Sequence, residues 1–293
     1  MWAQKAGGNL GDVGQAIATD EDGNVYVTGY FRSSFINFGS ITLFLSGDYN
    51  IFLVKYDPDG NVLWAKSSSS TSTSIAYNNS NGISITASGD IYIAGLFQST
   101  TITFGSTTLT NSVNGTGDIF IAKYDATGNA LWALKAGGLL EDGALSIAND
   151  NDGNAYVSGF FRSPSISFGS ITLSNLGSAA TSDLFILKCD GSGNAIWAHE
   201  TGGSNDEFSN DIATDQNGHV YITGEYLSAS ISFGSITLNN VSTGKPDLFL
   251  TKFDAAGNVI WAKMAGGQNY DYGMGIAADT ADNVFIAGYF NFN

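Results

Sequence analysis

The hexapeptide Phe-Gly-Ser-Ile-Thr-Leu occurs three times in this chain and limits its possible folds more than any other feature. It stands at residues 38–43, 168–173 and 233–238, and a near copy, Phe-Gly-Ser-Thr-Thr-Leu, stands at 104–109. Successive copies are roughly 65 residues apart. A period of this length indicates an array of similar units, so a residue that recurs in every copy is first of all part of the architecture.

Alignment on tryptophan reveals the whole repeat. Each Trp segment precedes a stretch such as DIATDQNGHVYITGEY (211–226), in which two alternating segments flank a D-x-x-G-N turn. A third alternating segment, such as DLFLTKFD (247–254), leads through a second turn into the next Trp segment. Alternating Val, Ile, Tyr, Phe and Thr bounded by Gly and Asp predict four strands per copy, and no amphipathic helix pattern is found. The aligned tryptophans are Trp2, Trp64, Trp132, Trp197 and Trp261.

The turn residues fit this interpretation. In D-x-x-G-N, the Asp side chain is expected to accept backbone N–H groups and the Gly to adopt the left-handed conformation. In the hexapeptide, Gly and Ser separate two alternating segments, and Gly at the first central position is what a type II′ turn requires. The hexapeptide therefore predicts a small hairpin between the second and third strands, with its Phe and Leu facing inward.

Four-stranded units that cannot close their own core predict an all-β fold, a β-propeller with an extra hairpin in each blade. The chain begins on a fourth strand and ends after a first and second strand, so we expect one domain over residues 1–293 with five repeat phases. The last blade is expected to be incomplete or shared between the termini. The alternative is a segment cut from a six- to eight-bladed parent. The expected repeats are approximately 9–66, 67–134, 139–199, 204–263, and 268–293 with 1–8.

The pattern SIAxDxxGNVYVxGYF followed by DxFLxKYDxxGNxxWAxxxGG resembles the SBBP-type β-propeller repeat proteins over nearly the whole chain. This family is common among large secreted and cell-surface proteins of Bacteroidota and relatives. The resemblance implies the propeller fold and a secreted or cell-surface location. It implies no catalytic residues, because the family is defined by its blades.

The composition limits the classes of ligand that the chain is expected to bind. The net charge is −16 with a pI near 4.1, which repels phosphate backbones and anionic lipid, so we expect no nucleic-acid or membrane-surface binding. Cations such as Ca²⁺ and neutral ligands such as glycans remain open. Cys189 is the only cysteine, so no disulfide framework is expected. No apolar run is long enough to span a membrane and no export signal follows Met1, so we expect a segment of a longer chain whose signal lies elsewhere.

The sequence does not contain the set of residues that a catalytic triad or a zinc site needs. The only histidines, His199 and His219, occupy positions that vary between copies, and Cys189 stands where other copies have Tyr or Phe, which predicts a packed thiol. The turns that begin at Asp20, Asp57 and Asp150 resemble the start of a calcium loop, but no Glu follows where a late bidentate ligand is needed. We therefore expect turn formation there, no confident metal site and no catalytic residue.

A second set of acids follows the Gly pairs on the connections between fourth and first strands. These connections are expected on the same face as the hairpins, where longer loops gather. Each Asp is expected to cap a backbone turn or to pair with a repeat lysine; the alternatives are a cation site and a pair of glycosidase carboxylates. The acids are Asp12, Asp142, Asp206 and Asp271, and the Ser-rich second copy is expected to have no equivalent.

Lysines recur on the third strand at Lys55, Lys123, Lys188 and Lys252. On a half-buried face, each must meet an acid or an aromatic ring, and a repeat Asp or Trp is expected to supply it. The tryptophans themselves are expected to pack between blades rather than to stack on sugars.

Three functions remain from these patterns. The first is a non-catalytic scaffold or interaction module for protein or surface adhesion. The second is a lectin-like or cation-dependent binder of protein or glycan ligands, and the third, least favoured because its acids are nearly equivalent, is a glycan-active enzyme. The expected contact aromatics of the binder are Phe35, Phe44, Tyr49, Phe208, Tyr270 and Tyr272.

Overall fold

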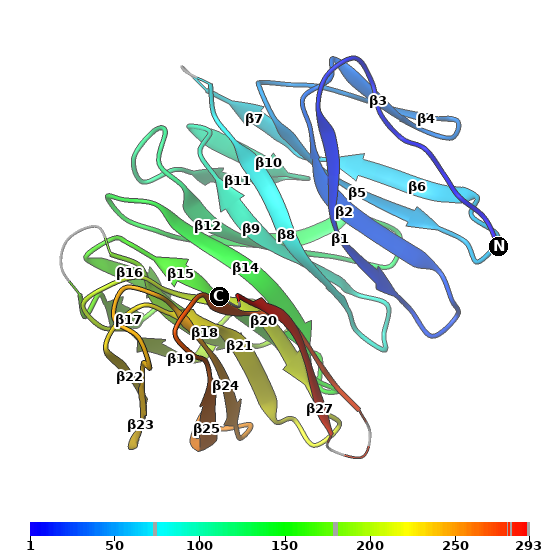
Figure 1. Ribbon diagram of the computed structural model, residues 1–293. Coiled ribbons are helices and arrows are strands. Elements are labelled where there is room, and N and C mark those ends of the chain that lie inside the picture. The colour runs from blue at the N-terminus through cyan, green and yellow to red at the C-terminus, as the bar shows by residue number, and fades with distance from the viewer. Residues whose placement is uncertain (73–74, 178–180, 280, 282, 292–293) are drawn as a thin grey trace. The chain divides into compact units, whose positions relative to one another are not determined.

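The computed structural model describes residues 1–291 except 73–74, 178–180, 280 and 282 (Figure 1). Every regular element in this part of the chain is a β-strand, and every strand pair is antiparallel. The expected all-β fold is confirmed. No helix that could cross a bilayer occurs among these residues.

The chain divides into two compact units, Met1–Ala136 and Gly137–Asn293, and each is described by itself. The first unit contains two four-stranded sheets, each built from the four repeat strands, which we name a to d in chain order. In the first sheet these are β1 (Asp12–Thr19), β2 (Val25–Phe31), β5 (Asn50–Tyr56) and β6 (Val62–Ser67). In the second sheet they are β8 (Asn78–Ile85), β9 (Ile91–Phe97), β12 (Asp118–Tyr124) and β13 (Ala130–Ala136).

The second unit repeats this order twice and then begins it a third time. Its first sheet contains β14 (Asp142–Asn149), β15 (Ala155–Phe161), β18 (Asp183–Cys189) and β19 (Ala195–Thr201). Its second sheet contains β20 (Glu207–Thr214), β21 (Val220–Tyr226), β24 (Asp247–Phe253) and β25 (Val259–Ala265). Strands a and b of the fifth repeat, β26 (Asp271–Ala278) and β27 (Val284–Phe290), form a two-stranded sheet.

The hexapeptide forms the expected hairpin between strands b and c. In the first repeat, Phe38 pairs with Ile41 across a Gly-Ser loop, and Gly39 has a φ of +56°. Ile36 and Phe38 are buried against Phe31 of strand b. The hairpin strands are β3 (Phe35–Phe38) with β4 (Ile41–Phe44), β10 (Thr101–Phe104) with β11 (Thr107–Thr110), β16 (Ser165–Phe168) with β17 (Ile171–Ser174), and β22 (Ser230–Phe233) with β23 (Ile236–Asn239); β7 (Ser69–Thr71) also pairs with β10.

The apolar core lies between neighbouring sheets. One cluster joins Tyr26, Ile51 and Leu53 of the first repeat to strands of the second, and another joins the third repeat to the fourth. The sequence predicted that one repeat cannot close its own core, and these side chains are indeed buried between two sheets. The expectations of one domain over residues 1–293 and of a shared closing blade stay predictions.

Three of the tryptophans, Trp2, Trp64 and Trp197, tie one repeat to the next. Trp64 on strand d of the first repeat donates its indole N–H to the carbonyl of Ala126 in the turn between strands c and d of the second. Gly128 in that turn has a φ of +82°, and a Cβ there would lie 3.0 Å from the Trp64 ring. Trp2 and Trp197 donate to Pro58 and Ala255 in the same way. These tryptophans therefore pack between repeats but stay partly exposed.

The strand c lysines recur with two partners. Each Nζ lies 2.9–3.9 Å from a carboxylate oxygen of the D-x-x-G-N turn and 4.9–5.1 Å from the centroid of a strand b tyrosine ring. The acid was expected, but the ring belongs to Tyr rather than Trp, because Tyr lies directly opposite the lysine in the b–c register. The sets are Lys55, Asp20, Tyr26; Lys123, Asp90, Tyr92; Lys188, Asp150, Tyr156; and Lys252, Asp215, Tyr221.

The second repeat reaches the same arrangement from a different turn. Thr86 stands in the slot of Asp20, and Asp90 stands in the slot of Asn24. The Thr86 hydroxyl accepts the Asp90 backbone N–H at 3.0 Å, and the Asp90 carboxylate lies 2.9 Å from Lys123 Nζ. The lysine therefore keeps a carboxylate although the acid has moved four residues along the turn.

We expect Asp90→Asn to lower the free energy of unfolding by about 1–3 kcal/mol, because it removes the carboxylate from a nearly buried ammonium group. Adding Thr86→Asp to this variant recreates the turn of the first repeat and should restore most of the loss. Urea unfolding of the two variants and the parent measures both effects. A double variant no more stable than Asp90→Asn would show that the position of the carboxylate does not matter.

Candidate functional site

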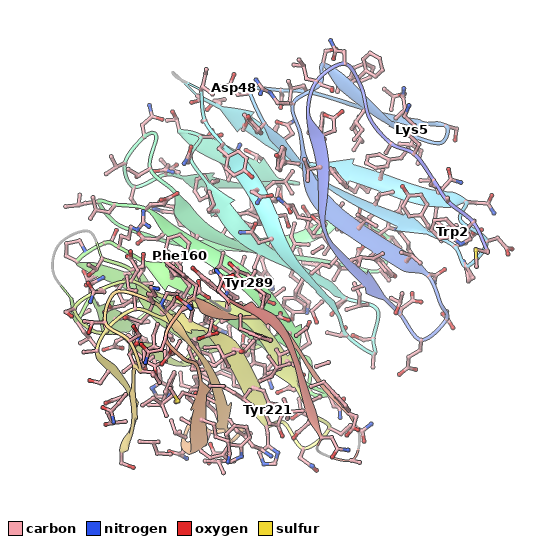
Figure 2. All side chains as sticks on the ribbon, viewed as in Figure 1. Trp2, Lys5, Asp48, Phe160, Tyr221 and Tyr289 are labelled. Carbon is pink, nitrogen blue, oxygen red and sulfur yellow. The ribbon has the colours of Figure 1, made fainter. Side chains whose placement is uncertain are left out.

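The connections from d to a and from b through the hairpin to c lie at one end of each sheet, which we name the loop face. The D-x-x-G-N turns lie at the opposite end. Figure 2 shows this division in the second unit, where Phe160 and Tyr289 near the loop ends of their strands lie away from Tyr221, which follows a turn. The expected grouping of the two kinds of connection is confirmed by the contacts described next.

Asp12 clamps two connections of the loop face together. One carboxylate oxygen accepts the backbone N–H of Gly8 on the d-to-a connection at 2.7 Å and the hydroxyl of Ser33. The other accepts the backbone N–H groups of Arg32 and Ser33 after strand b, at 3.2 and 3.1 Å. Asp142 repeats these bonds with Gly138, Arg162 and Ser163. The capping role expected for these two acids is thus what the structure shows.

Two assignments within this set were wrong. In the fourth repeat, the equivalent residue is Glu207, which accepts the N–H groups of Gly203 and Ser228, whereas Asp206 is one residue earlier and accepts the Ser182 N–H at 2.8 Å. In the second repeat, the equivalent residue is Asn78, whose Oδ1 accepts the Ser99 N–H. The sequence alignment missed both because Glu and Asn perform the same capping with different side chains. Asp271 keeps the pattern with a bond from Gly267 N–H at 2.8 Å.

None of these acids gathers with others into a metal site. Within the described residues, no group of three or more His, Cys, Asp or Glu side chains is arranged to hold a metal ion. A role for Asp12, Asp142, Asp206 or Asp271 in binding Ca²⁺ or another ligand stays a prediction. The turn acids have other partners: Asp57, for example, accepts the N–H groups of Asp59 and Asn61.

The histidines and the cysteine occupy structural positions. His219 stands in the Asn slot of its turn, and both its backbone N–H and its ring Nδ1 bond to Asp215, as Asn24 bonds to Asp20. His199 lies beside the Trp197 ring at a centroid distance of 5.2 Å. Cys189 is fully buried. Cys189 is therefore packed as the sequence predicted, whereas the histidines stand at positions that vary between copies.

Burial separates two classes of carboxylic acid. Desolvation raises the pKa of Asp142 and Asp183 to about 6 and that of Glu207 and Glu225 to about 7, although hydrogen bonds oppose the shift. The turn acid Asp254 behaves in the opposite way, because the side chain and backbone N–H groups of Asn258 lower its pKa. All five acids belong to the second unit.

The loop face also carries cations paired with aromatic rings. The chain has 11 basic residues, and eight of them are the four strand c lysines and the four lysines that follow a repeat Trp by two or three residues, Lys5, Lys66, Lys135 and Lys263. The other three each lie over a ring on the loop face, at 5.2, 5.7 and 5.5 Å from the centroid. These pairs are Arg32 with Tyr49, Arg162 with Phe160, and Lys245 with Tyr270.

Further rings surround these pairs. Tyr30, Tyr49 and Tyr77 form a three-membered cluster with centroid distances of 5.2–5.4 Å. In the second unit, Phe160 contacts Phe208, and Tyr270, Tyr272 and Tyr289 stack in series. The sequence named Tyr49, Phe208, Tyr270 and Tyr272 as contact aromatics, a role that stays a prediction, and did not point to the cations near them. The sequence did contain a signal for the cations, because Arg32, Arg162 and Lys245 are the only Lys and Arg residues outside the recurring lysine positions.

Phe35 and Phe44 are a separate pair. They lie opposite each other at the open end of the first hairpin, and their side chains are exposed. The corresponding pairs in the other hairpins are Thr101 with Thr110, Ser165 with Ser174, and Ser230 with Asn239. This aromatic pair is therefore specific to the first repeat, and its role as a ligand contact stays a prediction.

The two classes of acid predict a stability maximum near about pH 4–5. The folded chain holds protons on the buried acids that the unfolded chain releases, so the free energy of unfolding should fall as the pH rises from about 4 to about 7. Below about pH 4, it should fall again as acids such as Asp254 are protonated. Urea midpoints across this range measure the profile.

Glu225→Gln should flatten the limb between about pH 5 and 7, because it removes one of the two acids with a pKa near 7. Asp254→Asn is the matched control, which should leave that limb unchanged and alter only the acid limb. An unchanged slope between about pH 5 and 7 in Glu225→Gln would contradict the assignment of the raised pKa to this residue.

Comparison with known proteins agrees with this architecture. The family model SBBP, described as a beta-propeller repeat, matches residues 2–30, 196–225 and 260–293. An uncharacterized WD repeat-containing protein of Acanthamoeba polyphaga mimivirus is 29% identical, with 94% of this chain and 24% of that protein covered. The regulatory protein FlaEY of Caulobacter vibrioides is 28% identical, with 76% and 23% covered. The chain thus spans about a quarter of the length of these curated relatives.

Among solved structures, a protein of unknown function from Bacteroides caccae aligns over 73% of this chain and 90% of its own, with 11% identity and a TM-score of 0.22. A score this low does not establish a shared fold. Each segment that the family model matches contains a Trp segment followed by strands a and b of the next repeat. Residues 2–30, 196–225 and 260–293 are thus similar to the SBBP beta-propeller repeat.

Proposed function

We propose that this chain is a non-catalytic interaction module that binds a protein partner through its loop face, within a secreted or cell-surface protein. One observation carries the proposal. The strand c lysines pair with the fold's own acids and rings, whereas Arg32, Arg162 and Lys245 lie over aromatic rings on the loop face, where Arg162 also pairs with Glu141.

The chemistry of these pairs suits a protein contact. Aromatic residues and Arg are enriched among the side chains that contribute most to protein interfaces, and a cation held over a ring presents donors at a fixed position. On a chain with a net charge of −16, three such cations are local exceptions that favour an acidic or hydrogen-bonding partner surface.

The scaffold in this proposal is the propeller expected from the sequence, and the location follows the resemblance to secreted and surface proteins. Labelling of intact source cells with a membrane-impermeant reagent tests the location. The lectin-like alternative would use the same rings for sugar stacking and is therefore an outcome of the binding experiment below.

Binders selected against residues 1–293 from a displayed peptide library, together with a glycan array, test the binding face. We expect peptide binders whose affinity falls at least about tenfold in Arg32→Ala/Tyr49→Ala or in Lys245→Ala/Tyr270→Ala, because each double variant removes a cation and its ring. Biolayer interferometry measures the affinities.

Ile196→Ala and Ile260→Ala are matched controls, since both side chains are exposed on d strands away from the loop face. They should change the affinity less than about twofold. Peptide binders that respond to the controls but not to the loop variants would overturn the proposal. Glycan binding lost in the loop variants, without peptide binding, would replace it with the lectin-like function.

A further inference from the structure

The last strand of the second unit, β27, has an open edge. Four b strands of this chain pair with a on one side and with c on the other, whereas β27 pairs only with β26 among the described residues (Figure 1). Asn291 donates its backbone N–H to Tyr270 on the β26 side, so by strand alternation the N–H groups of Ile286 and Gly288 point to the open side. Such an edge is a template for another strand.

The side chains of β27 are of the kind that is buried in the other b strands, which have a neighbour on both sides. Its sequence VFIAGYF matches VYVTGYF of β2 and IYIAGLF of β9. Phe285 is 60% exposed, whereas its equivalents Tyr26 and Tyr92 are 0% exposed. Phe290 is 66% exposed, whereas Phe31 and Phe97 are 0% exposed. No Pro and no charged side chain occurs on β27 to discourage pairing.

The carboxylate that would pair with a strand c lysine is also present beside β27. Asp279 forms the usual turn, accepting the N–H groups of Ala281 and Asn283, and stands in the slot of Asp215. Asp215 pairs with Lys252 of strand c, but no ion pair joins Asp279 to a lysine or arginine of the described residues. The Asp279 carboxylate and the Phe285 ring thus correspond to two members of the lysine set whose third member belongs to strand c.

A place for the strand c phenylalanine is present as well. In every complete repeat, the glycine of strand b lies opposite a phenylalanine of c, as Gly224 lies opposite Phe249. Gly288 is the equivalent glycine of β27, and no strand that the structure describes pairs with it on the open side. Beside the loop end of the edge lies a cavity of about 710 Å³, lined by Leu248, Gly266, Gly267, Asp271 and Phe290 among others.

We propose that the open edge of β27 binds, by strand addition, a c-type strand from a further repeat of the same type outside residues 1–293. The occupant has an Asp, a Phe two residues later and a Lys three residues after that, as in DLFLTKF. In the b–c register, its Phe lies opposite Gly288 and its Lys opposite Phe285, within reach of Asp279. Backbone bonds supply affinity, and these two side chains supply specificity. This edge is distinct from the cation and ring pairs of the loop face.

A fluorescent peptide with the sequence of residues 246–256, PDLFLTKFDAA, tests this inference by anisotropy with the whole chain. We expect saturable binding, weakened at least about tenfold by Phe249→Ala in the peptide. Ile286→Pro in the protein should weaken binding at least about tenfold, because it removes one outward N–H while leaving the β26 side bonded. Ile286→Val keeps that N–H and should bind as the parent does.

A double-mutant cycle keeps the test valid if Ile286→Pro fails to fold. Asp279→Asn in the protein and Lys252→Ala in the peptide should each lower the affinity, and the two together should lower it no further than one alone. Additive losses, no binding of the parent peptide, or undiminished binding to folded Ile286→Pro would each overturn the inference. So would dimerisation of the chain alone that Ile286→Pro abolishes, since the edge would then serve a second copy.

Discussion

Burial of apolar side chains between neighbouring sheets is the constraint on which the rest of this structure depends. A four-stranded antiparallel sheet has two faces, and one repeat cannot cover both. The b and c strands are accordingly apolar on both sides, and large side chains such as Tyr26, Phe120, Phe185 and Phe249 are inaccessible to solvent. The Trp contacts, the hairpins and the lysine sets all lie around this packing and hold adjacent repeats in register with it.

Buried charge accompanies this packing because the repeat places a lysine on a central strand. An ammonium group there needs a carboxylate, and the turn between a and b supplies one beside a tyrosine ring. On the loop face, clamp acids such as Asp12 accept backbone N–H groups, while Asp118 and Glu141 pair with Lys135 and Arg162. The turn end of each repeat is therefore held by the ion pairs of the strand c lysines, and the loop end by caps together with two further ion pairs.

The repeat made most of the fold predictable. Strand order, the hairpin, the turn geometry and the partner acids of the lysines followed from alternation and turn chemistry, because each is a local consequence of sequence repeated several times. The errors arose where different side chains perform one task, as with Glu207 and Asn78 in the clamp positions and Tyr in place of Trp over the lysines. Of the candidate site, the rings were found but not their grouping, since Tyr30, Tyr49 and Tyr77 come from three separate segments. Only pairing across strands brings them together.

The displaced carboxylate of the second repeat has a consequence for how the copies diverged. If the copies descend from one ancestral repeat, two substitutions separate the Asp20 form of the turn from the Asp90 form, and their order matters. An intermediate with acids in both slots keeps the lysine paired, whereas an intermediate with neither leaves an ammonium group at the centre of the sheet without a carboxylate. Gain of the second acid before loss of the first is the route open to a folded protein. The turn residues of these repeats can thus change, but the order in which the substitutions occur is constrained.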